Sequence, residues 1–196
     1  MAIAPSKTWR VFCAIELPKP TRDLVLRHIA RVKAAVPAAR ATWSGDANLH
    51  LTLKFLGEVP QTSVADFSEA VSHAVAELQP FSLRLEHAGT FPSRGQPRVL
   101  WIGINNPSAQ LAELHARLEA ESARAGFAKE GREFHPHLTI ARLRQPADAR
   151  ALAAAHRQLE FEPLEIAVTE LLVIRSELRS EGSKYTVVSR HTLSPP

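Results

Sequence analysis

The 196-residue sequence has a single cysteine, Cys13, and no long apolar segment. One thiol excludes an internal disulfide and any zinc site built from several cysteines. No apolar run approaches the roughly 18 residues of a transmembrane helix, and residues 1–7 lack the basic segment and apolar core of a secretory signal. We therefore expect a cytoplasmic protein that does not associate with membranes.

The excess of one sign of charge is also small, since 24 basic and 20 acidic residues give a net charge of +4. This balance excludes a polybasic, histone-like protein but permits a partner that carries phosphate. Most basic residues are arginine, which suits bidentate phosphate contacts, although an arginine-rich genome is the plainer explanation. No stretch is rich enough in proline, glycine and serine to be a linker. We therefore expect one domain spanning residues 1–196, with two lobes, and a monomer.

The spacing of apolar residues predicts interspersed strands and helices. Consecutive strand segments favour antiparallel pairing, so the predicted fold class is α+β. The strands are expected over residues 8–17, 48–59, 81–87, 98–104, 137–143, 164–174 and 185–193, the last two joined by a loop at 180–183. The helices are expected over residues 21–35, 61–78, 107–125 and 147–159.

A four-residue pattern occurs twice, as His50-Leu51-Thr52-Leu53 and as His137-Leu138-Thr139-Ile140. Side chains alternate along a strand, so each His/Thr pair shares one face and the apolar residues share the other. Burial of the apolar faces against helices would leave each pair free to face a groove. If the two strands are neighbours, two imidazoles and two hydroxyls surround one small volume.

Such a cluster suits metal-free cleavage of a phosphodiester. Two imidazoles with pKa values near neutral can divide the roles of general acid and general base, and threonine hydroxyls can hold phosphoryl oxygens. Three alternatives remain open. The histidines could be half-buried residues with local hydrogen bonds, His50, His135 and His137 could hold zinc in a metal-dependent hydrolase, or the groove could bind an RNA end without turnover.

The two motifs and the segments around them resemble the 2H phosphoesterase superfamily, in particular its RNA 2′,3′-cyclic phosphodiesterase branch, also described as 2′-5′ RNA ligase. The likeness runs from about Arg10 to Leu193. It implies a bilobal fold, with two pseudo-symmetric lobes of antiparallel strands, outer helices and a central cleft. The segments that carry it are WRVFCAIELP, NLHLTLKFLGEV, FHPHLTIARL and VTELLVIRSEL with YTVVSRHTL.

The resemblance also implies an activity and roles for the motif residues. The expected reaction is hydrolysis of an RNA 2′,3′-cyclic phosphate end, or of a cyclic nucleotide, to a 2′-phosphate, without metal or cofactor. The reverse of 2′-5′ bond cleavage would be ligation, which water disfavours. His50 would be the proton donor to the ribose 3′ oxygen, His137 the base that activates water, and Thr52 and Thr139 would bind phosphate oxygens.

Two further residues match the family but conflict with simple alternation. Arg142 matches a phosphate-binding arginine, and Phe55 matches an aromatic residue that packs on the nucleobase. Each stands five positions after its histidine, so strict alternation turns it to the opposite face. Either the strands bulge or end after each motif, or these residues lie outside the site. Lys54 would share the face of His50, as a phosphate contact or, as we expect, a solvated lysine.

The remaining histidines and aromatic residues have weaker signals. His135 could support His137, and Tyr185 could line the cleft. Packing or surface roles are expected for the histidines in predicted helices, His28, His73, His115 and His156, and for His87 and His191 on strands. Trp43 and Trp101 are expected in the core or in the walls of a groove.

Overall fold

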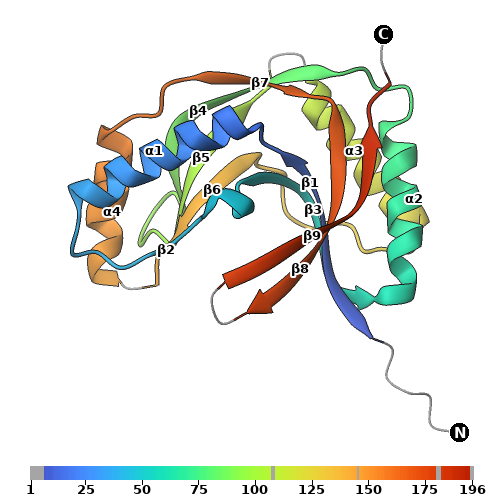
Figure 1. Ribbon diagram of the computed structural model, residues 1–196, viewed down its shortest axis with the longest axis horizontal. Coiled ribbons are helices and arrows are strands. Elements are labelled where there is room, and N and C mark those ends of the chain that lie inside the picture. The colour runs from blue at the N-terminus through green and yellow to red at the C-terminus, as the bar shows by residue number, and fades with distance from the viewer. Residues whose placement is uncertain (1–6, 107–108, 145, 180–181, 195–196) are drawn as a thin grey trace, which may run out of the picture.

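The computed structural model describes residues 7–106, 109–144, 146–179 and 182–194, which form strands and helices in two groups (Figure 1). The predicted α+β class is confirmed. The expected helix start at 107–108 and loop residues 180–181 lie outside the described residues. The strands are β1 (Thr8–Glu16), β2 (Thr42–Trp43), β3 (His50–Pro60), β4 (Phe81–Phe91), β5 (Val99–Asn105), β6 (His137–Arg142), β7 (Leu164–Val168), β8 (Glu170–Arg179) and β9 (Gly182–Thr192). The helices are α1 (Lys19–Ala35), α2 (Val64–Val75), α3 (Gln110–Arg124) and α4 (Pro146–Gln158), with short 3₁₀ turns η1 (Asp46–Asn48) and η2 (Gln61–Ser63).

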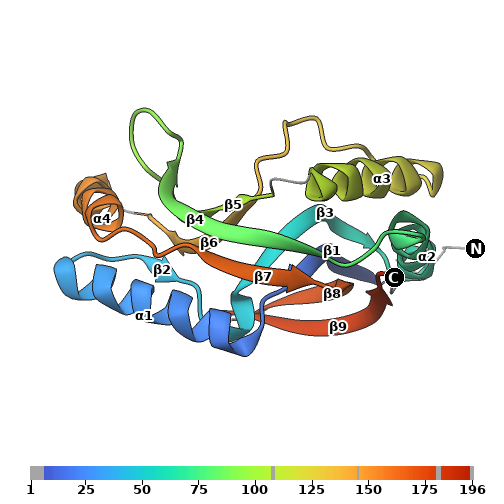
Figure 2. The same ribbon diagram turned by 90° about the horizontal axis from the view of Figure 1, so that it is seen from above.

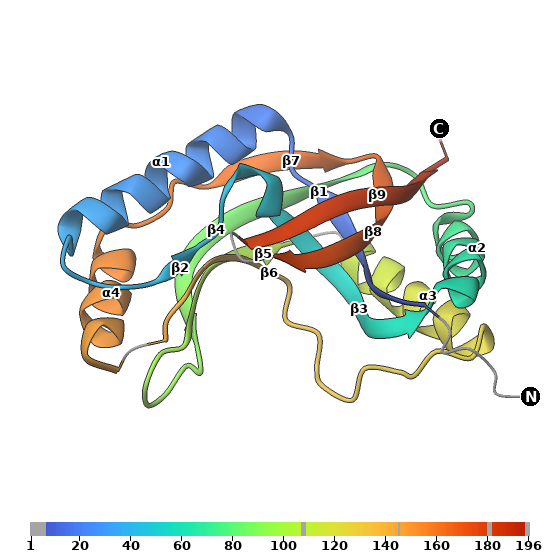
Figure 3. The ribbon, with the colours of Figure 1, turned by 60° about the horizontal axis from the view of Figure 1, so that its bottom comes forward.

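The strands form two antiparallel sheets with the helices outside them. Sheet A has the order β3-β1-β8-β9, and sheet B has the order β2-β6-β5-β4-β7. Helices α2 and α3 pack together beside sheet A, and α1 and α4 pack together beside sheet B. The two helix pairs therefore lie at opposite ends of the molecule, with the sheets between them (Figures 2 and 3).

The two halves of the chain repeat one pattern. Each motif strand pairs with an earlier strand from which one α-helix separates it in the sequence: β3 pairs with β1, across α1, and β6 pairs with β5, across α3. The next strand beyond β1 in sheet A is β8, and the next strand beyond β5 in sheet B is β4. The expected repeat of two lobes, each with one motif strand and backing helices, is confirmed. The halves also exchange strands, because β4 ends the first half but pairs with β5 of the second.

Two details of the strand prediction are wrong. Residues 164–174 were expected to form one strand, but the segment divides at Thr169 into β7 of sheet B and β8 of sheet A. Apolar residues alternate at Leu164, Ile166 and Val168, and a continuous apolar run over 171–174 follows Thr169 and Glu170. The division therefore falls at a break in the alternation that the one-strand prediction passed over. The two-residue strand β2 was not predicted, since two residues are too few to show a period.

One large apolar core fills the space between the sheets and their helices. The core includes the apolar residues of both motifs, Leu51, Leu53, Leu138 and Ile140. Helix α1 contributes Val25, Ile29 and Val32 at helical spacing, and α2 contributes Phe67, Val71 and Ala74. Among the described residues, no helix is long and apolar enough to cross a bilayer. Because the core holds the apolar face of each motif strand, the His/Thr face is turned away from it.

Candidate active site

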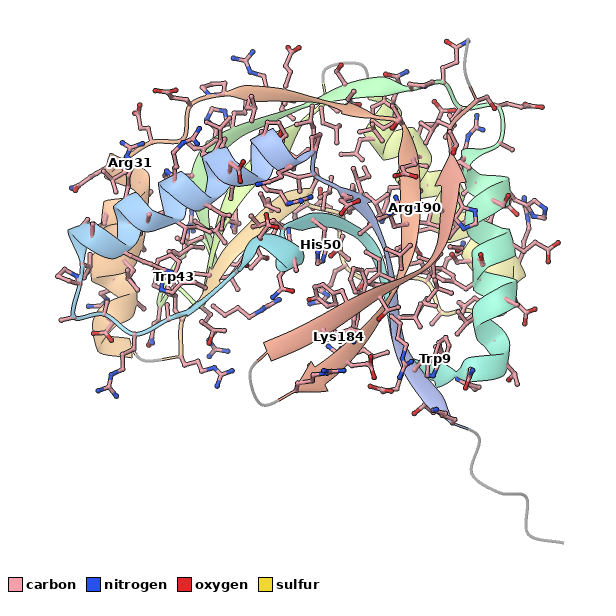
Figure 4. All side chains as sticks on the ribbon, viewed as in Figure 1. Trp9, Arg31, Trp43, His50, Lys184 and Arg190 are labelled. Carbon is pink, nitrogen blue, oxygen red and sulfur yellow. The ribbon has the colours of Figure 1, made fainter. Side chains whose placement is uncertain are left out.

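The two motif strands are in contact although they belong to different sheets. Strand β3 is the edge of sheet A, and β6 lies second in sheet B beside the short β2. The strands contact each other near the middle of the molecule (Figure 1), and His50 lies in this central region (Figure 4). The prediction that they are neighbours is confirmed, but they share no ladder. In both motifs the histidine and threonine are partly exposed and the residues between them are buried.

Strand β3 has a bulge directly after its motif. Thr52 pairs with Ala14 of β1, whereas Phe55 pairs with Phe12, so three steps along β3 match two steps along β1. Paired residues share a face of the sheet. The extra residue resets the alternation, as a β-bulge does, and Phe55 joins the face that carries His50.

Strand β6 bulges at the equivalent place. Thr139 pairs with Trp101 of β5, and Arg142 pairs with Val99, again three steps against two. The bulge puts Arg142 on the same face as His137. Of the readings that the sequence left open, the bulged strand is confirmed in both motifs.

The bulge in β3 turns Lys54 into the core. Both roles that the sequence suggested for Lys54, a phosphate contact and a solvated lysine, are therefore wrong. Its side chain is 3% exposed. The ammonium donates to Glu119 Oε1 of α3 at 2.7 Å and to the carbonyl oxygen of Ala128 at 2.9 Å. Lys54 is therefore neither a solvated lysine nor a contact for phosphate on the His50 face.

His50 lies in an aromatic environment on sheet A. Its ring stacks on Phe12, with centroids 4.8 Å apart, and meets the edge of Tyr185 at 5.2 Å. Burial lowers the pKa of His50 to about 4 because a charged imidazole loses hydration there. His50 is therefore neutral at neutral pH, and Tyr185, which the sequence left as a possible cleft residue, lies against it.

His137 is held by the backbone just before it. Its Nδ1 lies 2.7 Å from the carbonyl oxygen of His135, which can only accept, so Nδ1 carries the proton and Nε2 of the neutral ring has a free lone pair. Burial, with the nearby charges of Arg142 and His135, lowers the pKa of His137, although the bond to the carbonyl opposes this. The His135 imidazole is exposed and lies near Glu133. His135 thus supports His137 through its carbonyl and not through its side chain.

Aromatic rings also flank His137. The ring of Phe91 meets it edge-on, with the two centroids 4.9 Å apart, and the Trp101 ring centroid lies at 6.4 Å. The indole of Trp101 covers Gly89 so closely that a Cβ at this glycine would lie 2.1 Å from the ring. Trp101, expected in the core or in a groove wall, is partly buried and lies beside His137.

The family model described as the 2′-5′ RNA ligase superfamily matches residues 20–179. This chain belongs to that superfamily. It is 32% identical over 180 residues to the RNA 2′,3′-cyclic phosphodiesterase of Methanothermobacter thermautotrophicus, covering 90% of this chain and 95% of the relative. It is also 32% identical to the protein of the same name from Escherichia coli, covering 96% and 99%.

Solved structures agree with the superfamily assignment. TT0787 of Thermus thermophilus has a TM-score of 0.78 and 28% identity, covering 95% of this chain and 98% of its own. Escherichia coli LigT in complex with 3′-AMP has a TM-score of 0.75 and 29% identity, covering 96% and 99%. The resemblance to the 2H phosphoesterases that the motifs indicated is confirmed.

The other histidines of this superfamily member do not join the motif pair. His28 of α1 and His156 of α4 are buried in contact, with His28 Nε2 2.9 Å from His156 Nδ1. His156 Nε2 also lies 2.9 Å from the Trp101 carbonyl oxygen, which fixes it as a donor and its Nδ1 as the acceptor. This is the expected packing role. His115 stacks on Phe134, His191 contacts Ser68 and Ser189, and the side chains of His73 and His87 are largely exposed.

The zinc alternative is not supported by the geometry. Across the described parts of the chain, no three side chains of histidine, cysteine, aspartate or glutamate come together as ligands for a metal ion. His50, His135 and His137, which that alternative requires, point to separate partners.

Three neighbours of the motifs were not predicted from the sequence, and one of them is Phe91, whose ring lies beside that of His137. Phe12 lies under His50, and Ser44 contacts the backbone of the second motif. Phe12 carried a signal, since it lies in the family-like segment WRVFCAIELP, but only strand register shows that it meets His50. Ser44 carried none.

Proposed function

We propose that this protein hydrolyses the 2′,3′-cyclic phosphate end of RNA and leaves a 2′-phosphate. The observation that carries the proposal is the contact of two His-x-Thr strands, with a His137 whose Nδ1 is bonded to the His135 carbonyl, so that the lone pair of the neutral ring is on Nε2. Relatives that share about a third of their residues over most of the chain are named RNA 2′,3′-cyclic phosphodiesterase. A cyclic phosphodiester needs a base and an acid on opposite sides of phosphorus, which two imidazoles supply.

In this mechanism His137 is the general base and His50 the general acid. His137 Nε2 takes a proton from water as the water oxygen bonds to phosphorus. The bond from phosphorus to the ribose 3′ oxygen breaks, and His50 donates a proton to that oxygen. The products are a 3′ hydroxyl and a 2′-phosphate.

The residues on the same faces would hold the substrate. The hydroxyls of Thr52 and Thr139 donate to the non-bridging oxygens, where negative charge grows in the transition state. Arg142 adds a charged donor to the phosphate. Phe55 is 44% exposed and its ring lies 4.5 Å from the Arg10 guanidinium carbon, so Arg10 restrains a ring that is open to a nucleobase.

The state of His50 before binding predicts an unusual pH dependence. The general acid must be protonated, so activity falls as the pH rises through the pKa of His50. That pKa is about 4 in the free protein, and the negative charge of a bound phosphodiester raises it. Since kcat/KM reports the free enzyme and kcat the complex, we expect the alkaline limb of kcat to lie at higher pH than that of kcat/KM. Coincident limbs in steady-state pH profiles would contradict this account.

One assay tests the proposed function. An oligonucleotide ending in a 2′,3′-cyclic phosphate is incubated with the protein in the presence of chelator, and the product is identified by regiochemistry. A 2′-phosphate formed in chelator supports the proposal. A 3′-phosphate, or loss of activity in chelator, contradicts it, and binding without turnover would favour the RNA-end binding module. Parallel reactions with 2′,3′-cyclic mononucleotides show whether the polymer is required.

We also propose that the chain acts as a single monomeric domain. Each half places a strand in the sheet of the other half, and both motif strands belong to one chain. Sedimentation of the active protein at the mass of one chain tests this.

A further inference from the structure

Ser44 is bonded twice to the second motif strand. Its backbone N–H donates to the carbonyl oxygen of Ile140 at 2.9 Å. Its hydroxyl donates to the carbonyl oxygen of Thr139 at 2.8 Å. One residue therefore takes two consecutive carbonyls of β6, one with its main chain and one with its side chain.

Two consecutive carbonyls on the same edge are the mark of the bulge. In a regular strand, successive carbonyls point to opposite edges. Here both point toward the β2 side, at the place where β6 has its extra residue opposite Leu100 and Trp101 of β5. The regular ladder between β2 and β6 ends at Trp43, which pairs with Ala141. Ser44 follows directly, and its hydroxyl binds the Thr139 carbonyl, which the regular backbone hydrogen bonds between β2 and β6 do not reach.

This bulge decides which way Arg142 points. With it, Arg142 shares a face with His137 and Thr139; without it, alternation would turn Arg142 to the other face. Ser44 also lies in the short connection to the first motif, because Gly45, η1 and Leu49 are all that separate it from His50. Asp46 of η1 is itself held by Arg22 of α1, at 2.8 Å between Nε and Oδ1. The segment that follows Ser44 is thus anchored to α1 through Asp46 and Arg22, while Ser44 itself binds the bulge in β6.

We propose that Ser44 is a positioning residue that stabilises the β6 bulge and so directs Arg142 toward the substrate phosphate. The proposal rests on the proposed function, since Arg142 is taken to bind phosphate. Ser44 touches no substrate. Its hydroxyl acts only through the backbone of β6.

The test is a double-mutant cycle on Ser44 and Arg142. Ser44→Ala keeps the backbone donor and removes the hydroxyl, so the Thr139 carbonyl loses its partner and the bulge can relax. Misplacement of a binding group by about 1 Å can cost as much as 10²-fold in rate, and we expect kcat/KM to fall roughly 10-fold, mostly through KM. Ser44→Thr keeps a hydroxyl and should recover most of the loss. In the Arg142→Ala background, Ser44→Ala should have little further effect, because the group it positions is gone.

A control and a second measurement separate positioning from general weakening of the fold. Ser68→Ala removes a hydroxyl that donates to Ser189 at 2.7 Å, between α2 and β9 and away from both motifs. It should leave kcat/KM within about twofold of the parent. Binding of a nucleoside 2′-phosphate by calorimetry is measured on all variants and should weaken in parallel with the rise in KM.

The outcomes divide clearly. An equal fold-loss from Ser44→Ala in the parent and in the Arg142→Ala background would overturn the proposal, as would parental kcat/KM in Ser44→Ala. If the parent binds the 2′-phosphate but turns over no cyclic phosphate, the proposed function fails, and the same cycle on binding still decides the role of Ser44. If Arg142→Ala binds and reacts like the parent, Ser44 has no phosphate ligand to position and the proposal is wrong.

Discussion

Replacement of either His50 or His137 by alanine is expected to lower kcat by roughly 10²–10⁴-fold, the usual contribution of one proton-transfer group. His137→Ala removes the Nε2 lone pair that would take the proton from water. His50→Ala removes the donor to the leaving oxygen. The double variant should be little worse than either single variant, because groups that act as a unit are not additive. Turnover of a cyclic-phosphate oligonucleotide in chelator measures all three.

Two controls make this result specific. His73→Ala removes a largely exposed imidazole on α2 and should keep parental kcat. Circular dichroism of each variant shows that the fold is retained. A folded His50→Ala protein with near-parental turnover, free of contaminating phosphodiesterase, would show that the acid is another group.

The second large effect is on stability, and it concerns the buried ion pair between β3 and α3. Glu119→Ala is expected to lower the free energy of unfolding by about 3 kcal/mol, since it leaves a buried ammonium without its partner. The Lys54 side chain is 3% exposed and that of Glu119 is 14% exposed, so the charge left on Lys54 is poorly hydrated. The Glu119 carboxylate also accepts from the backbone N–H of Glu130 at 3.0 Å, in the segment leading to His137. Urea unfolding followed by circular dichroism measures the loss.

Helix α3 offers a matched control. Glu113 pairs with Arg117 at 2.7 Å on the exposed side of the same helix. Glu113→Ala should cost less than about 1 kcal/mol, as exposed pairs do. The double variant Lys54→Met/Glu119→Leu should be more stable than Glu119→Ala, because no unpaired charge remains buried. Equal losses from the two glutamate variants would contradict the account.

The same pair predicts the direction of a pH effect. Burial alone would raise the pKa of Glu119, but Lys54 and the Glu130 N–H hold it below its ordinary value. The stabilisation is therefore present above the unfolded pKa of about 4.3 and is lost as the pH falls through the lower folded pKa. The stability difference between the parent and Glu119→Gln should shrink over that acid range.

The sequence could predict the motif faces because alternation is local. Leu51 and Leu138 stand between a histidine and a threonine, and strand geometry alone sets these residues on opposite faces. The sequence left a bulge as one of several possibilities and could not decide among them, because an extra residue depends on the register with a neighbouring strand. In β6 two consecutive apolar residues, Ile140 and Ala141, carry a faint sign of one. In β3 the second inward position is Lys54, whose charge conceals the same pattern.

Contacts between residues far apart in the sequence could not be predicted from local patterns either. The stack of Phe12 on His50 and the burial of Lys54 against Glu119 depend on which strands and helices meet. The buried lysine shows the limit most clearly, since its partner lies on a helix far along the chain. Residue type gives the ordinary exposure of lysine, and only tertiary structure reverses it.

The strand exchange between the halves has a consequence for how such a chain can arise. Strand β4 of the first half pairs with β5, and β8 of the second half pairs with β1. In topology this is a strand-swapped homodimer whose two copies are fused between β4 and β5. A half alone would present an unpaired edge, whereas two fused halves close both edges and supply one histidine each. Fusion also frees the copies to diverge, and at equivalent positions after the motif one copy has Phe55 and the other Arg142.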